Sequence, residues 1–415
     1  MKKYVLFASC IKDMGGGQMY LRNRCVYMQE KGWEVDLFSA QRGTIFIPEL
    51  KKYDYFIPEL GFDFYLFSKS KVEKIITQIL NVIMDKQYDE IIFESSCLSE
   101  STWAEFIAER CGARHFCYIL QEYNPISSIN DQEFVKFKYG RKELAGIAPS
   151  SLYDMFFPFS PIEKDKSFFL PAPCNNVVED IEHSFINTVN WKDYKYVVGC
   201  LSRIDKPFVI PALHDFINYV KHRSDKFLLL MIGGAPEGTS FENNIRKLFK
   251  PINNVDILIT GYLFPVPLKL LRACDVFFTS AGSSWVCMHA GVPTITYDGL
   301  DFRPIGILGK TTNSSLYRSD NEPIQDLATL MDDVLLNKMY HKETASLSLD
   351  KPDFSAHDLF IASLPSDKAY YSFNSIQLTK SEKKLSFSLR ILGAERYFQL
   401  GVIKKRILNH KTSDR

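Results

Sequence analysis

A stretch of small residues at 279–293 has the composition of an anion-binding turn. Short apolar segments at 275–278 and 294–296 flank it and predict two strands, with a short helix over 285–290 that Gly291 ends. A small-residue loop that leads into a helix presents free N–H groups and the positive end of the helix dipole to an anion. The stretch could therefore bind a nucleotide diphosphate, and it could equally be an ordinary turn of an α/β domain. The candidate binding residues are Ser280, Gly282, Ser283 and Ser284.

Two cations follow another apolar segment, 196–201, which predicts a strand. Arg203 offers paired N–H donors and Lys206 a point charge, and together they could hold a diphosphate. In a reaction they would neutralise the charge that builds up on a departing phosphate, which makes them candidate catalytic residues. The alternative is that both are solvated surface charges.

Three consecutive glycines, Gly15, Gly16 and Gly17, separate a predicted strand at 4–10 from a predicted helix at 19–31. They lack the G-x-G-x-x-G spacing of a dinucleotide-binding turn. We interpret them as a loop that lets a ligand approach the backbone closely, with a plain tight turn as the alternative.

Polar residues also follow three other predicted strands, and ligands of open parallel sheets bind beyond the carboxyl ends of the strands. Glu94, Glu122 and Ser150 are therefore candidates to line a cleft. Glu122 could act as a general base or hold an acceptor hydroxyl. For each glutamate the alternative is a solvated loop carboxylate or a helix cap.

Strands and helices alternate along the whole chain, which predicts an α/β protein of two doubly wound domains. The polar, aperiodic stretch after Pro171 predicts a linker. We therefore expect an N-terminal domain at 1–185, a C-terminal domain at 186–345 with the ligand site in the cleft between the two, and an extension at 346–415.

The composition is that of an ordinary globular protein, with 46% hydrophobic and 24% charged residues. A net charge of +1 gives no field that would favour nucleic acid. The nine cysteines contain no C-x-x-C pair, which favours reduced thiols in a cytoplasmic protein. No D-x-D motif and no set of residues with metal-ligand spacing occurs, so we expect neither a metal nor a cofactor.

The ordered set of these motifs resembles the GT-B fold glycosyltransferases, in particular the nucleotide-sugar-dependent family 4 (group 1). The resemblance extends over residues 3–300 and is strongest over 196–298. It rests on the segments Gly15–Gln18, Ser202–Lys206, Gly233-Gly234, Thr260–Leu263 and Asp275–Thr294.

The resemblance implies a role for each matching segment. Arg203 and Lys206 match the pair that binds the donor diphosphate, and 15–17 match the loop near the donor phosphates and the acceptor. The backbone of Gly261, Tyr262 and Leu263 would read the nucleobase, and 280–284 would form the phosphate-binding helix start.

One departure concerns the glutamate pair, E-x7-E, that this family carries ahead of its A-x-G-x-P segment. The first glutamate would fall near 278–281, where no acid occurs, and the second near Val286, whose side chain accepts no hydrogen bond. Backbone amides and hydroxyls of the 280–284 loop would then have to hold the donor. The histidine of the family's N-terminal cleft has no clear match, and Glu122 occupies a similar place.

The resemblance implies a glycosyltransferase that moves a sugar from a nucleotide-diphosphate sugar to a saccharide or lipid-linked acceptor. Transfer would be retaining and metal-independent, and it would take place in the cytoplasm during bacterial surface polysaccharide synthesis. Two alternatives stay open: a nucleotide-sugar epimerase on a similar frame, and a non-catalytic partner that binds nucleotide sugars.

The end of the chain is basic and amphipathic. From Lys380 to Arg415 it carries ten Lys and Arg residues against three acids, interleaved with apolar residues. Such a segment could bind an anionic membrane and bring the enzyme to a lipid-linked acceptor. It could also pack across the domains with its charges solvated.

Overall fold

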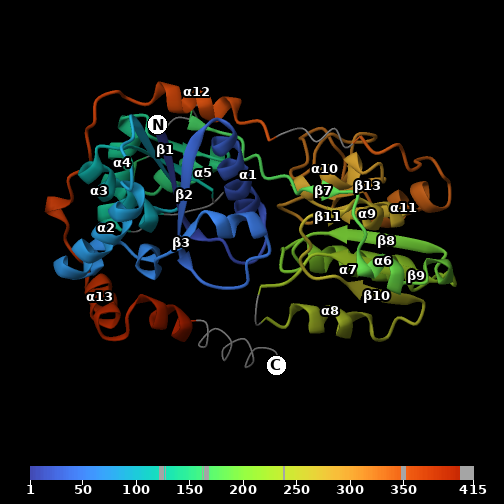
Figure 1. Cartoon of the computed structure of the whole chain (residues 1–415). Helices are drawn as coiled ribbons and strands as arrows, with labels where there is room; N and C mark the ends of the chain where they lie inside the picture. The colour runs from blue at the N-terminus through green and yellow to red at the C-terminus, as the bar shows by residue number, and fades with distance from the viewer. Residues whose placement is uncertain are drawn as a thin grey trace. The chain divides into compact units, whose positions relative to one another are not determined.

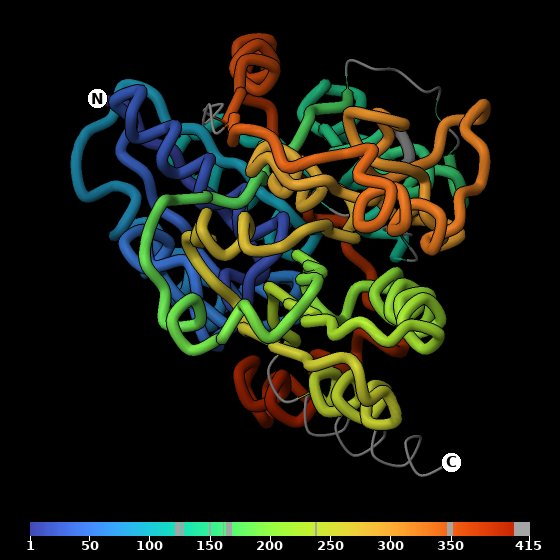
Figure 2. Tube along the Cα trace, turned by 90° about the vertical axis from the view of Figure 1, so that its right-hand side faces the viewer, coloured from blue at the N-terminus to red at the C-terminus, as the bar shows by residue number. Residues whose placement is uncertain are grey.

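The computed structural model describes residues 1–120, 126, 128–160, 162, 168–236, 239–346 and 352–401. The chain forms two compact units, and Figures 1 and 2 show its course from two directions. The first comprises Met1–Lys12, Tyr20–Pro173 and the chain from Pro352 on, and the second comprises Asp13–Met19 and Cys174–Lys351. The predicted boundary at residue 185 thus lies inside the second unit, and the chain beyond 352 belongs to the first unit rather than to a separate extension.

The first unit is built on a six-stranded sheet in the order β3-β2-β1-β4-β5-β6, with every neighbouring pair parallel. This is the doubly wound order, and the strand order reverses between β1 and β4. The strands are β1 (Lys2–Cys10), β2 (Trp33–Gln41), β3 (Asp54–Phe56), β4 (Glu90–Ser95), β5 (Arg114–Ile119) and β6 (Leu144–Gly146).

Helices and short 3-10 turns connect these strands, and the C-terminal part of the chain adds two more helices to the same unit. The α-helices are α1 (Gly16–Glu30), α2 (Lys69–Ile83), α3 (Leu98–Cys111), α4 (Ile129–Gly140), α5 (Pro149–Phe156), α12 (Ser355–Ser363) and α13 (Lys380–Leu392). The 3-10 turns are η1 (Pro48–Lys52), η2 (Pro58–Gly61), η3 (Phe64–Leu66) and η6 (Phe373–Ser375). Leu389 of α13 is buried in the same hydrophobic cluster as residues of β1, β4, α2 and α3.

The second unit repeats this plan with the order β10-β9-β8-β12-β13-β14, in which only the β13–β14 pair is antiparallel. Its sheet strands are β8 (Tyr196–Leu201), β9 (Phe227–Ile232), β10 (Val255–Ile259), β12 (Val276–Thr279), β13 (Thr294–Tyr297) and β14 (Pro304–Ile307). A separate parallel pair joins β7 (Val178–Glu179) to β11 (Val266–Pro267). The helices are α6 (Ser184–Thr188), α7 (Val209–Val220), α8 (Phe241–Phe249), α9 (Leu268–Ala273), α10 (Gly282–His289) and α11 (Leu327–Leu335), with a 3-10 turn η5 at Trp191–Asp193.

Alternating side chains of the second sheet fill two separate cores, because successive residues of a strand face opposite sides. In β9, Phe227, Leu229 and Met231 join one cluster with α7 and α11. The residues between them, Leu228, Leu230 and Ile232, join the other cluster with α9 and α10. Burial on both faces explains why these strands are continuous apolar runs in the sequence.

Candidate functional site

The strand order of the second sheet reverses between β8 and β12, and this is where an open α/β sheet binds its ligand. The hydroxyl of Thr279, at the end of β12, donates to the carbonyl of Leu201, at the end of β8, over 2.6 Å. The two segments predicted to bind a phosphate, Ser202–Lys206 and 280–284, follow these two strands directly. The fold therefore places both at the carboxyl edge of the same sheet.

The loop after β8 is held by the glycine pair that follows β9. The Ile204 N–H donates to the Gly234 carbonyl over 3.1 Å. Gly233 lies so close that a Cβ there would come within 1.9 Å of the Ser202 carbonyl oxygen, and its φ of +149° disfavours any other residue. Only glycine lets the two backbones meet, and this contact fixes where Arg203 leaves the loop.

The glycine segment 13–19 belongs to the second unit, where Gly15 lies against Arg203. A Cβ built on Gly15 would be 3.4 Å from Nη1 of Arg203 and 3.6 Å from its Cδ. The predicted loop is shorter than expected, since α1 begins at Gly16 and the Met19 N–H donates to the Gly15 carbonyl. Gly16 and Gly17 are therefore the first residues of a helix, and their backbone N–H groups have no partner within the helix.

The predicted nucleobase segment closes another side of the same site. Gly261 has a φ of +71° and forms an isolated bridge with Gly233, and Leu263 is buried. The ring of Tyr262 lies where a Cβ on Gly234 would be, at 2.7 Å. Burial raises the pKa of Tyr262, with Asp13 raising it further and Arg203 lowering it. Tyr262 therefore stays a neutral phenol near both of these charges.

The serines around the start of α10 have different environments. The Ser280 hydroxyl donates to the Tyr297 carbonyl over 2.8 Å, within the unit. The Ser284 hydroxyl is fully buried and has no hydrogen-bond partner in the described part of the chain. The residue that precedes the first turn of α10 is Ala281, with a φ of +58°. Because the helix starts at Gly282, the groups it offers an anion are the backbone N–H groups of its first turn.

Lys206 is exposed. Its charge acts on Cys174, a residue of the stretch that the sequence predicts to be a linker. Burial raises the pKa of the Cys174 thiol, and Lys206 partly offsets that effect. The side chain of Cys174 also lies against Gly16, with Sγ 3.7 Å from a Cβ built there. Sequence reasoning missed Cys174 because the stretch after Pro171 has no periodicity and carries no motif.

The residues of the first unit that the sequence predicts to line a cleft are Glu94, Glu122 and Ser150. Glu94 is buried, accepts a hydrogen bond from the Tyr20 hydroxyl over 2.6 Å and another from the Tyr4 hydroxyl, and pairs with Arg24 over 3.3 Å. A carboxylate enclosed in this way stabilises the packing of α1 on the sheet rather than lining a cleft. Ser150 lies in α5, and Glu122 lies outside the described residues.

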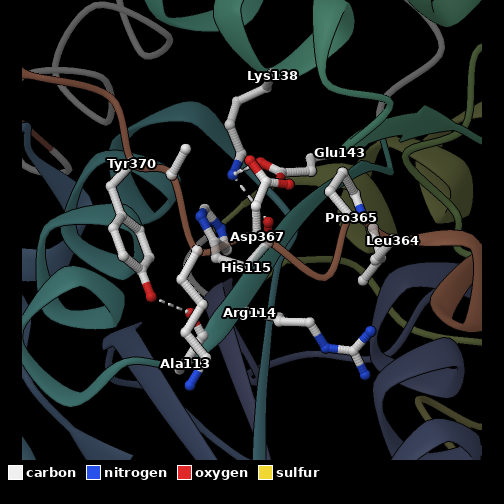
Figure 3. Close-up of a pocket in the computed structure, with 11 residues that line it drawn as sticks. Ala113, Arg114, His115, Lys138, Glu143, Leu364, Pro365, Asp367 and Tyr370 are labelled. Atoms are coloured by element: carbon white, nitrogen blue, oxygen red, sulfur yellow. Dashed lines mark hydrogen bonds and ion pairs between the residues drawn. The ribbon is translucent and has the colours of Figure 1, made fainter.

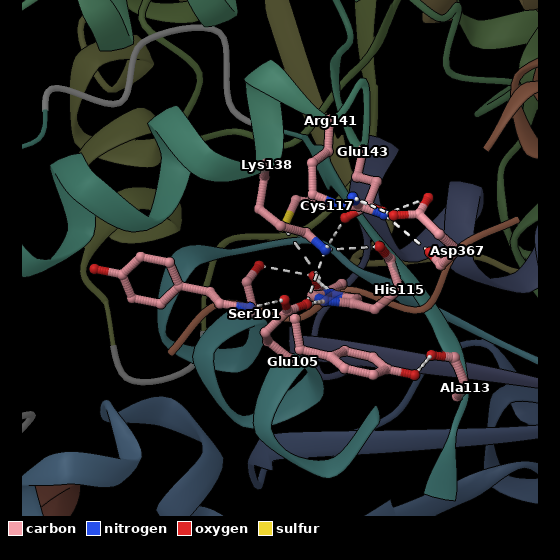
Figure 4. Close-up of polar contacts among 12 residues, drawn as sticks. Ser101, Glu105, Ala113, His115, Cys117, Lys138, Arg141, Glu143 and Asp367 are labelled. Carbon is pink, nitrogen blue, oxygen red and sulfur yellow. Dashed lines mark hydrogen bonds and ion pairs between the residues drawn. The ribbon is translucent and has the colours of Figure 1, made fainter. Parts of the chain in front are cut away.

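A second buried network in the first unit has the outline of a Ser–His–Glu triad (Figure 4). Ser95 Oγ is 2.8 Å from Nε2 of His115, and Nδ1 of His115 is 2.7 Å from Oε2 of Glu105. Lys138 donates to Glu105 over 2.8 Å and to Glu143 over 2.7 Å. Burial and the Lys138 charge lower the pKa of His115, so the imidazole is neutral.

This network is structural, because Ser95, Glu105 and Lys138 are at most 1% exposed and no substrate can reach them. Residues of the C-terminal part of the chain cover the network. The Tyr371 N–H donates to Glu105 over 2.8 Å, and Asp367 forms an ion pair with Arg141. Figure 3 shows a narrow pocket at the edge of the network, lined by His115, Lys138 and Glu143 and, from the C-terminal part of the chain, by Pro365 and Tyr370. The network therefore anchors the returning chain on the first unit.

Two further findings concern the described residues alone. No helix among them is long and apolar enough to cross a membrane. Among the same residues, no three His, Cys, Asp or Glu side chains come together in a group that could hold a metal ion.

Comparison with known proteins gives structural neighbours only. No protein-family model and no curated sequence matches the chain. Anabaena HepE, solved in complex with UDP and glucose, is 12% identical over 94% of this chain and 100% of its own, with a TM-score of 0.56. A glycosyltransferase from Rickettsia africae is 16% identical over 87% of this chain and 94% of its own, with a TM-score of 0.52.

These likenesses, with the two doubly wound units, establish the fold. The chain is an α/β protein of the GT-B type, the Rossmann-like architecture of these glycosyltransferases. At such low identity the likeness extends to the fold and no further.

Proposed function

We propose that the protein is a glycosyltransferase that takes a sugar from a nucleotide-diphosphate sugar. The observation that carries this proposal is the contact between Gly15 and Arg203 at the point where the second sheet reverses its strand order. It combines a cation, a close backbone approach and the first turn of α1 in one place. This combination suits a diphosphate, which needs charge and N–H donors together.

Arg203 and Lys206 hold the donor diphosphate in this proposal and stabilise the negative charge on the departing nucleotide. The backbone at Gly261–Leu263 binds the nucleobase, and the first turn of α10 offers its N–H groups to the phosphates. The reaction needs no metal ion in this proposal, because Arg203 and Lys206 supply the positive charge, and it is retaining, as the resemblance to family 4 implies. The acceptor is a saccharide or a lipid-linked saccharide of a bacterial surface polysaccharide.

Nucleotide binding is the first test. Thermal unfolding with UDP, GDP, ADP and dTDP should show a higher midpoint with one of them, because a ligand that binds only the folded state stabilises it. UDP is the first probe, since HepE was solved with UDP and with UDP-glucose. No shift with any of the four, and none in direct calorimetry, would contradict the proposal.

Product analysis then separates the three functional classes. A transferase releases the nucleoside diphosphate and forms a new glycoside, an epimerase returns an isomerised nucleotide sugar, and a binding partner leaves the nucleotide sugar unchanged. Adding EDTA should leave transfer intact. Transfer that EDTA abolishes and magnesium restores would contradict the metal-independent mechanism.

We also propose that α13 contacts the cytoplasmic face of a membrane and so brings the enzyme to a lipid-linked acceptor. Phe387 and Ile391 are each 65% exposed, and with 3.6 residues per turn they share one face of the helix. Four exposed cations flank them on that side: Lys380, Lys383, Lys384 and Arg390. The opposite face is anchored, since Leu389 is buried and the Ser386 hydroxyl donates to the Leu66 carbonyl.

The acid of α13 is turned away from this exposed face. The Glu382 carboxylate accepts hydrogen bonds from the Thr379 N–H and from the Ser128 hydroxyl. A rigid helix that presents two apolar side chains among cations, with no carboxylate between them, fits an anionic lipid surface.

A further inference from the structure

The segment that follows Pro173 lies between the first residues of α1 and of α10, which both belong to the second unit. The Cys174 side chain lies against Gly16, the first residue of α1, with Sγ 3.7 Å from a Cβ built there. Oδ1 of Asn175 is 3.6 Å from a Cβ built on Gly282, the first residue of α10. One short loop thus touches both helix starts that the proposed donor site uses.

The surroundings of this loop favour an anion. Each helix start carries free N–H groups and the positive end of its dipole. Lys206 is close enough to act on the Cys174 thiol. The Ser284 hydroxyl, in the first turn of α10, is fully buried and has no partner among the described residues. Such an orphan hydroxyl is rare in a protein interior and is a further polar group at this helix start.

Asn175 has the chemistry to complete the site. Its side chain is exposed, and its carboxamide makes no hydrogen bond with any residue that the structure describes. A carboxamide offers two N–H donors and an acceptor oxygen without a charge. It can therefore bind a diphosphate oxygen without the repulsion that a carboxylate would add.

We propose that Asn175 is a donor-binding residue, whose carboxamide N–H donates to the diphosphate of the nucleotide sugar at the start of α10. This inference rests on the proposed function, because it places one more group around the same donor. It assigns a role to the short loop that follows Pro173, where a nucleotide bound by Asn175 would also shield the neighbouring thiol of Cys174.

The test measures UDP binding by calorimetry for the full chain and three variants. Asn175→Ala should weaken binding about tenfold, the usual effect of losing one hydrogen bond to a charged group. Asn175→Asp should weaken it more, because a carboxylate beside the diphosphate repels it. Asn243→Ala, an exposed asparagine on α8, is the matched control and should bind UDP as the wild type does.

Alkylation of Cys174 by iodoacetamide, followed by peptide mass spectrometry, gives a second readout on the unaltered chain. Saturating UDP should slow alkylation of Cys174 at least several-fold and leave Cys111, a half-buried thiol of α3, unchanged. If UDP binds and depends on Arg203 but neither Asn175→Ala nor Cys174 protection shows an effect, the role of Asn175 is wrong while the proposed function stands. If neither UDP nor GDP, ADP or dTDP binds, both proposals fall.

Discussion

The guanidinium of Arg203 is held by the carboxylate of Asp205, two residues further along the same loop. Nε and Nη2 of Arg203 each lie 3.0 Å from a different carboxylate oxygen of Asp205. Two such parallel bonds fix the plane of the guanidinium. They leave Nη1, the nitrogen nearest to Gly15, on the side of the glycine segment. Asp205 therefore orients Arg203 and at the same time competes with a diphosphate for it.

Removing the cation should weaken nucleotide binding. Arg203→Ala deletes charge-assisted hydrogen bonds to the diphosphate, so we expect the Kd for UDP to rise by about 10- to 100-fold. Arg246→Ala, an exposed arginine of α8, is the matched control and should leave the Kd unchanged. Calorimetry at fixed ionic strength measures both, and equal affinity of Arg203→Ala and wild type would remove Arg203 from the donor site.

Removing the competing carboxylate should have the opposite effect. Asp205→Asn keeps the size of the side chain and one acceptor for Arg203 but deletes a negative charge beside the diphosphate site. We expect UDP to bind about three- to tenfold more tightly, as expected for one nearby like charge near a protein surface. The same titration in high salt should reduce the difference, because salt screens a partly exposed charge. Weaker binding would show that orientation by Asp205 outweighs its repulsion.

The alternation of apolar segments predicted the fold because five of the six strands of the second sheet, all but β10, are buried on both faces. The strand at 196–201 has the predicted bounds. What the sequence could not show was which loops meet, because the contact between Gly15 and Arg203 joins residues far apart in the chain. The sequence also could not predict the environment of the serines at 280–284, because α10 starts at Gly282 and not at 285. A different helix start changes which hydroxyls face inward.

The two buried serines of this stretch should respond to substitution with opposite signs. Ser280→Ala loses the hydrogen bond to the Tyr297 carbonyl, so the free energy of unfolding should fall by about 1 kcal/mol. Ser284→Ala removes a buried hydroxyl that has no partner in the described chain, so the free energy of unfolding should rise by about 1 kcal/mol. Urea unfolding of both variants without ligand measures the difference. A loss of stability in Ser284→Ala would show that its hydroxyl is satisfied.

The buried network of the first unit predicts a loss of stability in acid. Burial raises the pKa of Glu105, but Lys138 and His115 more than offset this and bring the pKa to about 2. The carboxylate titrates near 4.3 in the unfolded chain, so its contribution is complete above that pH and disappears as the pH falls toward 2. Breaking the network with Glu105→Gln should lower the free energy of unfolding by about 3 kcal/mol at pH 7, because it removes one of the two carboxylates that compensate the buried charge of Lys138.

Urea unfolding between pH 3 and pH 7 measures this effect. The wild type should lose stability below pH 4.3, and Glu105→Gln should lack that part of the slope. Glu73→Gln, which breaks an exposed pair with Arg110, is the matched control and should follow the wild-type profile within a few tenths of a kcal/mol. Parallel profiles for wild type and Glu105→Gln would show that the ionised carboxylate contributes nothing.

The exposed face of α13 should bind anionic vesicles through its apolar pair and its cations together. Phe387→Ser with Ile391→Ser removes the apolar surface that would enter the lipid, and Lys383→Gln with Lys384→Gln removes two charges worth about 1 kcal/mol each at an anionic surface. Co-sedimentation with phosphatidylglycerol vesicles should therefore fall about tenfold or more for either pair, while phosphatidylcholine vesicles bind little of any variant.

The matched controls for α13 alter similar residues elsewhere on the surface. Leu359→Ser on α12 changes an exposed leucine, and Arg246→Gln with Lys247→Gln on α8 changes two exposed cations; both should sediment as the wild type does. Wild-type sedimentation of both α13 variants would contradict a membrane role for this helix.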